Sequence, residues 1–382
     1  NTADYRPPFW SGLSREQVLA MWQRKLDSLG VRSKYPGLYE YEMEMKAKVG
    51  PMSIQLPLAD RISSIEKYYD TLPSEPISDE AIQATIAWFK PLAGVRLRSP
   101  DKTKANMRLN TNSGTPYFTK RRSVVDLSDK GYERAAILGW RGQEGGLSDD
   151  DVKQRVIWMM PFLLNVEELQ FYQPGIEIVQ AYNLIPAYVS MDAVDREVTA
   201  LFDSKPASDV VICTDFSSYD QHFNYDMQQA AAKVIGALCP HLAGWLSKTY
   251  PQKFKIPLIC SESLMFTGDH GMGSGSGGTN FDESISHKSL QFEAALEHGS
   301  KLNRHSMAYG DDGILTYPGI TVDQVIDSYT RHGQEMNASK QMVSRTEAVV
   351  LRRWHSFNYR ENGIMVGVYA TFRALGRLLA QE

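Results

Sequence analysis

Two short stretches decide the fold: DVVICTDFSSYD at residues 209–220 and HSMAYGDDGILTY at residues 305–317. The first opens with a β-branched apolar run that ends at Asp215, which predicts a buried strand with an acid at its carboxyl end. The second has two apolar runs joined by Gly-Asp-Asp-Gly, a pattern typical of a β-hairpin. If the two strands are neighbours in one sheet, Asp215 converges with Asp311 and Asp312.

Converging carboxylates suit divalent cations, because hard cations take oxygen ligands. Transfer of a phosphoryl group from a nucleoside triphosphate needs two such ions, about 3.5–4 Å apart, at the attacking and leaving oxygens. The sequence therefore predicts two Mg²⁺ or Mn²⁺ ions held by Asp215, Asp311 and Asp312. The alternative is that Asp-Asp-Gly only makes a turn and Asp215 only caps the next helix, and each motif taken alone favours that alternative.

The elements around these stretches are predicted from capping and periodicity. Helices are expected at residues 14–29 with Ser14 and Gln17 as a capping box, at 78–90, at 224–238, at 279–297 opened by Thr279 with Asp282, and at 321–331. A short apolar strand is expected near residue 264, ahead of a glycine-rich loop. Strands and helices alternate in the second half of the chain.

Composition limits the class of protein. The chain has 382 residues, 42% of them hydrophobic, so it can bury a large core and hold two or three lobes. It has no run of eighteen apolar residues, and its start lacks the order of a secretory signal, so neither membrane insertion nor export is expected. The widely spaced Cys213, Cys239 and Cys260 argue against a disulfide framework or a zinc site and fit a reducing, intracellular setting.

Charge is divided unevenly along the chain. Residues 95–141 contain eleven Lys or Arg against four Asp or Glu, whereas residues 142–382 contain nineteen against twenty-nine. A basic segment of this kind is either an ordinary solvated surface or the wall of a channel that follows phosphates. The second interpretation places it opposite an acidic, metal-binding lobe.

Three motifs in this order resemble the viral RNA-dependent RNA polymerases, most closely those of picobirnaviruses and related small double-stranded RNA viruses. DFSSYD at 215–220 looks like the first palm motif, GSGSGGTN at 273–280 like the Ser-Gly-x-x-x-Thr loop, and YGDD at 309–312 like the metal-binding hairpin. The resemblance spans roughly residues 105–357. It implies an α+β, right-hand polymerase of fingers, palm and thumb, with an antiparallel palm sheet flanked by helices.

The resemblance also implies roles for the palm residues. Asp215 and Asp311 would hold the metal ions, with Asp312 beside them as a weaker ligand. Asp220 would sense the ribose 2′-hydroxyl, the group that distinguishes RNA from DNA. The loop residues Ser274, Gly275, Thr279 and Asn280 would contact the nucleotide.

One palm position departs from the family pattern. Glu283 stands four residues after Thr279, where the family usually has Asn. That Asn normally cooperates with the second palm Asp in reading the sugar. Either Asn280, one turn earlier, or Glu283 itself would then serve here.

Basic residues complete the implied site. KQRVIWMMP at 153–161 is similar to the fingers motif that lines the nucleotide tunnel, so Lys153 and Arg155 would face the triphosphate. Lys340 would stand where the family has a lysine that protonates departing pyrophosphate. NSGTP at 112–116 and TKRR at 119–122 look like template-binding motifs, and the residues implied are Ser113, Gly114, Pro116, Lys120, Arg121 and Arg122. LRRWH at 351–355 resembles the primer grip.

The resulting division of the chain follows the hand analogy. We expect an N-terminal extension and part of the fingers at 1–93, fingers at 94–205, palm at 206–235, a fingers insertion at 236–263, palm at 264–350, and the start of a thumb at 351–382, its completeness left open. The expected partners are an RNA template, the nascent RNA, nucleoside triphosphates and a viral capsid protein, with no membrane. The expected location is the virion interior or the host cytoplasm.

Three alternatives compete with this interpretation. A reverse transcriptase would share the chemistry but take deoxynucleotides, and a non-catalytic RNA-packaging protein would use only the basic segment. A serine hydrolase with Ser276 as nucleophile, Asp311, and His332 or His355 fits the Gly-x-Ser-x-Gly pattern. That hydrolase elbow needs a strand running directly into the first glycine, whereas the predicted strand ends near Thr267.

Overall fold

The computed structural model describes residues 12–127 and 135–380. Lys130 and Arg134 of the basic segment lie outside the described residues. Within the described ranges, no helix combines the length and the apolar character that crossing a membrane would need. Cys213, Cys239 and Cys260 are free thiols, as their spacing predicts.

A four-stranded antiparallel sheet lies at the centre, in the order β10-β3-β8-β7. Its strands are β3 (Val211–Thr214), β7 (Met307–Tyr309), β8 (Asp312–Leu315) and β10 (Met342–Ser344). Thr214 lies opposite Gly313, and Tyr309 lies opposite Asp312. The predicted buried strand and the predicted hairpin are therefore confirmed as neighbours. A two-stranded sheet, β4 (Phe216–Ser217) with β9 (Glu335–Met336), continues beside them.

Helices cover this sheet and form the largest core with it. They are α5 (Asp79–Trp88), α9 (Tyr225–Leu238), α11 (Thr279–Glu297) and α12 (Val322–Arg331), and α8 (Met191–Ser204) packs in a second core with β3, β7 and β8. Ser78 and Thr321 cap two of them as predicted, and Asn224 caps a third; each side chain accepts a hydrogen bond from the backbone N–H three residues on.

The prediction for the start of α11 is wrong in detail. Gly278, not Thr279, precedes the first helical residue, and it provides no side-chain cap. The Thr279 hydroxyl lies 3.3 Å from the carbonyl oxygens of both Gly273 and Ser276, to which it donates. Thr279 therefore closes the glycine loop onto the helix instead of capping the helix.

A second four-stranded sheet has the order β2-β1-β5-β6. Its strands are β1 (Ala136–Gln143), β2 (Lys153–Met159), β5 (Leu258–Ser261) and β6 (Leu264–Phe266), accompanied by α4 (Ile62–Glu66), α6 (Pro100–Ala105), α7 (Phe162–Ala181) and α10 (Ala243–Lys248). The expected domain limit at residue 264 falls between the paired strands β5 and β6. Strand β6 thus belongs with the preceding segment.

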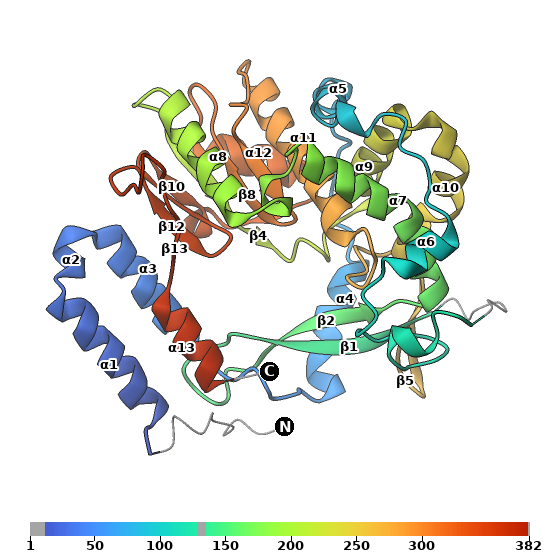
Figure 1. Cartoon of the computed structure of the whole chain (residues 1–382), viewed down its shortest axis with the longest axis horizontal. Coiled ribbons are helices and arrows are strands. Elements are labelled where there is room, and N and C mark those ends of the chain that lie inside the picture. Colours follow the sequence, from blue (N-terminus) through green and yellow to red (C-terminus); the bar gives the residue numbers. More distant parts are fainter. Residues whose placement is uncertain (1–11, 128–134, 381–382) are drawn as a thin grey trace.

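The first and last helices that the structure describes lie side by side (Figure 1). The N-terminal helices α1 (Arg15–Ser28), α2 (Val31–Lys34) and α3 (Pro36–Lys46) share a core with the C-terminal helix α13 (Thr371–Leu379). Between α13 and the central sheet lies a third sheet of β11 (Glu347–Val350), β12 (Arg353–Ser356) and β13 (Val368–Tyr369). Its tight turn places Leu351 and Arg352 at φ of 51° and 63°, as a two-residue hairpin turn requires.

Helices α1 and α13 also contact the connection between β1 and β2. Glu144 Oε1 lies 2.7 Å from the Arg373 guanidinium and 2.8 Å from that of Arg377, both on α13. Arg15 on α1 pairs with Asp149 at 3.0 Å and donates to the Leu147 carbonyl. The turn end of the long β1–β2 hairpin therefore contacts both α1 and α13 (Figure 1).

A fully buried ionic network joins helices α7 and α11 to the segment that carries Lys253. Lys253 Nζ donates to Asp282 Oδ2 at 2.5 Å and lies 3.7 Å from Glu168 Oε2, with all three side chains inaccessible to solvent. The Tyr172 hydroxyl donates to Asp282 at 2.7 Å. Ser276 of the glycine loop donates to Glu168. One lysine thus holds acids from α7 and α11 and, through Glu168, the loop between them.

We expect Lys253→Met to lower the free energy of unfolding by about 3–5 kcal/mol, because it leaves two buried carboxyl groups without their cation. Urea denaturation followed by circular dichroism measures the change. Lys255→Met is the matched control, since this nearby lysine is exposed, and it should change the value by less than about 0.5 kcal/mol. Equal effects of the two substitutions would contradict a structural role for the network.

Candidate functional site

The acids at 215, 311 and 312 lie at the joined ends of β3 and β8. Because Thr214 pairs with Gly313, the register continues with Asp215 beside Asp312, and Asp311 occupies the hairpin turn. Asp215 and Asp311 are exposed, and Asp312 is half-buried. The structure therefore brings together the three acids that the sequence singled out.

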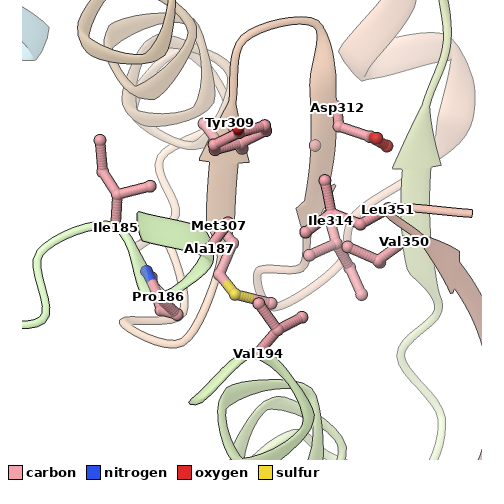
Figure 2. A pocket seen from close by; sticks show the side chains of 12 residues that line it. Ile185, Pro186, Ala187, Val194, Met307, Tyr309, Asp312, Ile314, Val350 and Leu351 are labelled. Carbon is pink, nitrogen blue, oxygen red and sulfur yellow. The ribbon is translucent and has the colours of Figure 1, made fainter. Parts of the chain in front are cut away.

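The three carboxylates do not form one compact group. The Asp312 side chain turns toward the backbone amide of Leu351 and lines a small apolar cavity of about 10 Å³ with Ile314 and Val350 (Figure 2). That cavity is too small for a nucleotide. The three acids therefore divide into two groups. Asp215 and Asp311 face solvent, and Asp312 lies deeper, beside the apolar cavity.

Electrostatics at these acids favours a cation. Burial raises the pKa of Asp312 to about 7, and the charges of Asp311 and Asp215 add to the effect. Partial loss of solvent around the carboxyl group raises the pKa of Asp215 as well; the charge of Lys340 opposes this effect, and repulsion from Asp311 adds to it. Carboxyl groups that repel one another in this way are stabilised by a positive ion among them.

A glutamine fixes the backbone at Asp215. Gln341 Oε1 accepts a hydrogen bond from Asp215 N at 2.8 Å, and Gln341 Nε2 donates to Asp215 O at 2.9 Å. Sequence reasoning missed Gln341, and it also missed Lys48, whose charge lowers the pKa of Asp215. Neither residue belongs to a local pattern, and both lie more than one hundred positions from Asp215.

Helix α11 holds the hairpin turn. Gly310 N donates to Ser284 Oγ at 2.8 Å, and His287 Nδ1 lies 2.8 Å from Gly310 O. Burial lowers the pKa of His287 to about 4, so its imidazole is neutral and Nδ1–H is the donor. Gly310 has φ of 57°, a left-handed conformation that glycine adopts without strain. The turn that carries Asp311 is therefore rigidly placed.

Asp220 is hydrogen-bonded to Glu283, the residue that departs from the family pattern. Burial and the neighbouring Asp220 carboxylate raise the pKa of Glu283 well above its ordinary value. Glu283 is thus the member of the pair that keeps a proton, and its O–H donates a hydrogen bond to the Asp220 carboxylate. Asn280 instead accepts from Ser284 Oγ at 3.2 Å. The partner of Asp220 is Glu283 and not Asn280.

The glycine loop lies against strand β2. Ser274 Oγ accepts from Trp158 N at 3.3 Å and lies 3.4 Å from Val156 O. A side chain at Gly275 would place its Cβ 1.8 Å from the Trp158 carbonyl oxygen, so only glycine fits there. The same strand carries Lys153 and Arg155, both exposed. Lys153 acts electrostatically on Asp215, and Arg155 acts on Asp220.

The segment implied to bind template is only partly accessible. Ser113 is fully buried and its hydroxyl accepts from Thr119 N at 3.2 Å. Gly114 is also buried, and a Cβ there would meet the Met160 carbonyl oxygen at 2.0 Å. In this conformation the Ser113 side chain is not accessible to RNA and Gly114 has no room for a side chain, so both residues shape the loop. Their contact with a template stays a prediction.

The remaining template candidates differ in exposure. Pro116, Lys120 and Arg122 are exposed, whereas Arg121 is half-buried. With its amide oriented for hydrogen bonding, Asn165 joins Arg121 Nη2 to the Gly275 carbonyl, each at 3.1 Å. Arg121 thus acts as a support for the glycine loop.

The hydrolase alternative fails on geometry. Ser276 donates to Glu168 inside the protein, His332 contacts Glu75 O at 2.7 Å, and His355 contacts Asp195 at 2.8 Å. No histidine bonds to Ser276 among the hydrogen bonds of the described residues. The loop therefore does not form a nucleophile elbow.

Comparison with known proteins agrees with the geometry. The sequence pattern described as viral RNA-dependent RNA polymerase matches residues 150–359. A potential RNA-dependent RNA polymerase of human picobirnavirus is 47% identical over an alignment 399 residues long. The alignment covers 99% of this chain and 74% of that protein.

Two crystal structures of the RNA-dependent RNA polymerase of a human picobirnavirus also superpose closely. The first has a TM-score of 0.95 at 47% identity, covering 99% of this chain and 76% of that chain. The second, an insertion-loop deletion mutant, has a TM-score of 0.94 at 47% identity, covering 98% and 78%.

The fold and the site together define a right-hand nucleic-acid polymerase. The chain belongs to the viral RNA-dependent RNA polymerases. It is therefore a nucleotidyltransferase that uses an RNA template and nucleoside triphosphates, and enzymes of this family depend on divalent metal ions. The reverse-transcriptase and RNA-packaging alternatives have no support in these comparisons.

The raised pKa of Asp312 predicts that, in protein treated with chelator, this carboxyl group lowers the free energy of unfolding as the pH rises. Its carboxyl group binds a proton more tightly when folded (pKa about 7) than when unfolded (about 4), so stability falls as pH rises between these values. At pH 8 we expect Asp312→Asn to be more stable than wild type by about 2 kcal/mol, allowing for solvent screening. Near pH 4 the two should be equal.

Urea denaturation across pH 4–8 measures this difference. Exposed Asp327→Asn is the control and should follow the wild-type curve. A stability gain in Asp312→Asn that does not vary with pH would contradict the electrostatic explanation.

Proposed function

We propose that the chain replicates and transcribes a viral RNA genome by metal-assisted transfer of a nucleotide to an RNA 3′-hydroxyl, with release of pyrophosphate. Asp215 and Asp311 would hold two divalent ions, Mg²⁺ or Mn²⁺, with Asp312 as the weaker ligand. The donor set fits such ions, because Asp215 and Asp311 are exposed, repel each other and have rigidly held backbones. The bound ions would neutralise charge on the attacking and leaving oxygens.

The observation that carries this proposal is the register of β3 with β8. It sets Asp215 next to the Asp311–Asp312 turn while the glycine loop and β2 lie alongside. The chain's own residues then position the reactants.

Lys153 and Arg155 would neutralise and orient the triphosphate from β2, since both act electrostatically on the acidic site. Lys340 would protonate departing pyrophosphate, and its charge also lowers the pKa of Asp215. Ser274, Gly275 and Thr279 would form the loop under the nascent base pair. Pro116, Lys120 and Arg122 would contact the template.

Asp220 and Glu283 would read the sugar. A protonated Glu283 donates to Asp220, as an Asn amide would, and leaves the Asp220 carboxylate ready to accept from a ribose 2′-hydroxyl. A 2′-deoxy substrate would leave this carboxylate without a partner, which disfavours it.

The division into domains is also proposed. We infer fingers at 94–205 and 236–266, palm at 206–235 and 267–350, and an N-terminal extension and thumb start at 1–93 and 351–382, with the limit moved from 264 because β6 pairs with β5. A capsid protein is the proposed further partner. The virion interior or the host cytoplasm is the proposed location.

We expect Asp311→Asn to reduce RNA synthesis at least a thousandfold while leaving RNA affinity within twofold, because the substitution removes a metal ligand and no template contact. Incorporation of labelled nucleotides on an RNA template, with and without chelator, measures synthesis, and fluorescence anisotropy measures affinity. Asp327→Asn is the matched control. Equal synthesis by Asp311→Asn and wild type would sink the proposal.

The sugar-reading pair predicts a graded loss of selectivity. Glu283→Ala should lower the ratio of kcat/KM for a ribonucleotide over its 2′-deoxy analogue at least tenfold, because Asp220 loses its hydrogen-bond donor. Glu283→Gln retains a donor and should stay within about threefold of wild type. If Asn280→Ala lowers the ratio and Glu283→Ala does not, Asn280 reads the sugar instead.

A further inference from the structure

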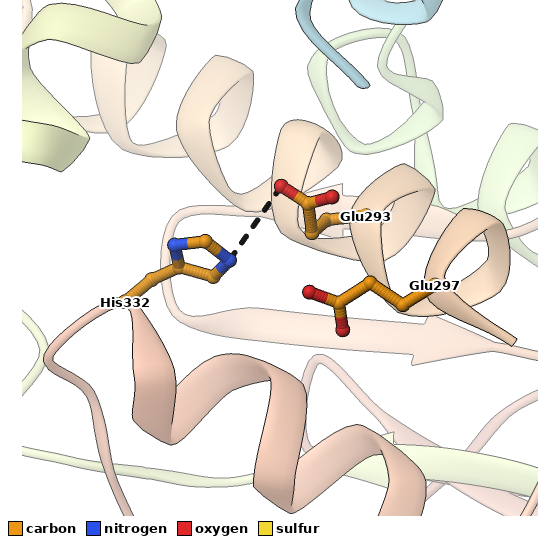
Figure 3. Close-up of side chains that lie close together, drawn as sticks. All are labelled: Glu293, Glu297 and His332. Atoms are coloured by element: carbon orange, nitrogen blue, oxygen red, sulfur yellow. Dashed lines mark ion pairs between the residues drawn. The ribbon is translucent and has the colours of Figure 1, made fainter. Parts of the chain in front are cut away.

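Away from the acidic site, three side chains of metal-binding type meet where α11 ends against the end of α12. Glu293 and Glu297 lie one turn apart on α11, and His332 follows the last residue of α12 (Figure 3). One ligand atom from each lies within 4.8 Å of the other two. The three groups therefore face a common point.

The imidazole of His332 is prepared to act as a ligand. Its Nδ1 lies 2.7 Å from the Glu75 carbonyl oxygen, which can only accept, so Nδ1 carries the hydrogen. In this tautomer Nε2 presents a lone pair. His332 is 3% exposed, and Nε2 has no hydrogen-bond partner. A second hydrogen bond that orients the ring in this way is usual for histidines that bind metal ions.

The lone pair points toward carboxylates and not toward a donor. Nε2 lies 3.6 Å from Glu293 Oε2, which is too long for a hydrogen bond (Figure 3). Two lone pairs facing each other in a buried position repel unless a cation lies between them. That cation is either a proton on His332, which would make an ion pair with Glu293, or a metal ion.

Both carboxylates have partners that hold them in place. Glu293 is buried and accepts from Ser78 N at 2.6 Å, and Glu297 accepts from Arg331 at 2.5 Å. Glu293 Oε2 is also the oxygen that faces His332 Nε2, but a carboxylate oxygen has two lone pairs, so these bonds do not exclude a ligand role. The side chain of Glu297 is 18% exposed, which gives an ion a route to the cluster.

We propose that Glu293, Glu297 and His332 bind one divalent transition-metal ion, with Zn²⁺ the ion that this ligand set suits best. One imidazole and two carboxylates are ligands that zinc accepts, with a water molecule as fourth ligand. Bonds of about 2.0–2.2 Å set ligand atoms roughly 3.5 Å apart, so the partly exposed Glu297 would move inward. The ion ties α11 to α12 at the end of α11 opposite the glycine loop.

This site is separate from the acids of the polymerase. Glu293 lies six residues beyond His287, the residue of α11 that contacts the hairpin turn, which is about 9 Å along the helix axis. A metal bound there does not share ligands with Asp215 or Asp311. Its effect is on how firmly α11, which carries Ser284 and His287 under the hairpin turn, is held.

Zinc binding to the full chain tests the proposal. After chelator treatment and dialysis, equilibrium dialysis against Zn²⁺ is compared in an Asp311→Asn background, which weakens binding at the acidic site. We expect Glu297→Gln to bind the tightest Zn²⁺ ion at least tenfold more weakly, and Glu262→Gln, at an exposed acid elsewhere, to bind it unchanged. Glu297 is partly exposed, so the variant should fold.

X-ray absorption of the zinc-loaded protein supplies the second measurement. We expect one imidazole nitrogen in the coordination shell of the tightest Zn²⁺ ion, and we expect His332→Gln to lose it. We also expect Zn²⁺ to raise the Tm of the protein but not that of Glu297→Gln. Equal Zn²⁺ affinity in Glu297→Gln and Glu262→Gln, or a shell without imidazole nitrogen, would overturn the proposal and leave a proton on His332 as the cation.

Discussion

Antiparallel pairing of β3 with β8 is the constraint on which the acidic site depends. It sets Thr214 opposite Gly313, so acids from distant parts of the sequence come to one edge of one sheet. A slip of one residue would turn these side chains to the other face. Ser284 and His287 of α11 bond the hairpin turn on both sides of Gly310 and so fix the register. The helix after the glycine loop is therefore the scaffold of the turn that carries Asp311.

The glycine loop is held from the opposite side by buried charge. Glu168, Lys253 and Asp282 come from three separate segments and have no contact with solvent. Burying ions costs free energy, and the attraction between them offsets that cost only when their geometry is good. The role of such a network is therefore better explained by the segments that it positions than by a gain in stability. Here it places Ser276 and the start of α11, while β2 receives Ser274 and Gly275. Loop, strand and helix thus form one unit beside the acidic site.

Much of this could be predicted from the sequence where the signals are local. The strand ending at Asp215 and the Gly-Asp-Asp-Gly hairpin follow from short patterns, and the structure confirms both. Local reasoning failed at Thr279, whose hydroxyl closes a loop instead of capping a helix, and the family resemblance gave no sign that the Ser113 side chain is buried. It could not find Gln341, because no pattern predicts a side chain that bonds the backbone more than one hundred positions away. Glu283 was visible as a departure from the family, but its pairing with Asp220 depends on tertiary contacts.

The attachment of Glu144 to α13, together with that of Asp149 to α1, has a mechanical consequence. The first and last described helices both contact the β1–β2 hairpin, although they lie at opposite ends of the sequence. A movement of this hairpin away from either helix would therefore have to break ion pairs at Glu144 or Asp149.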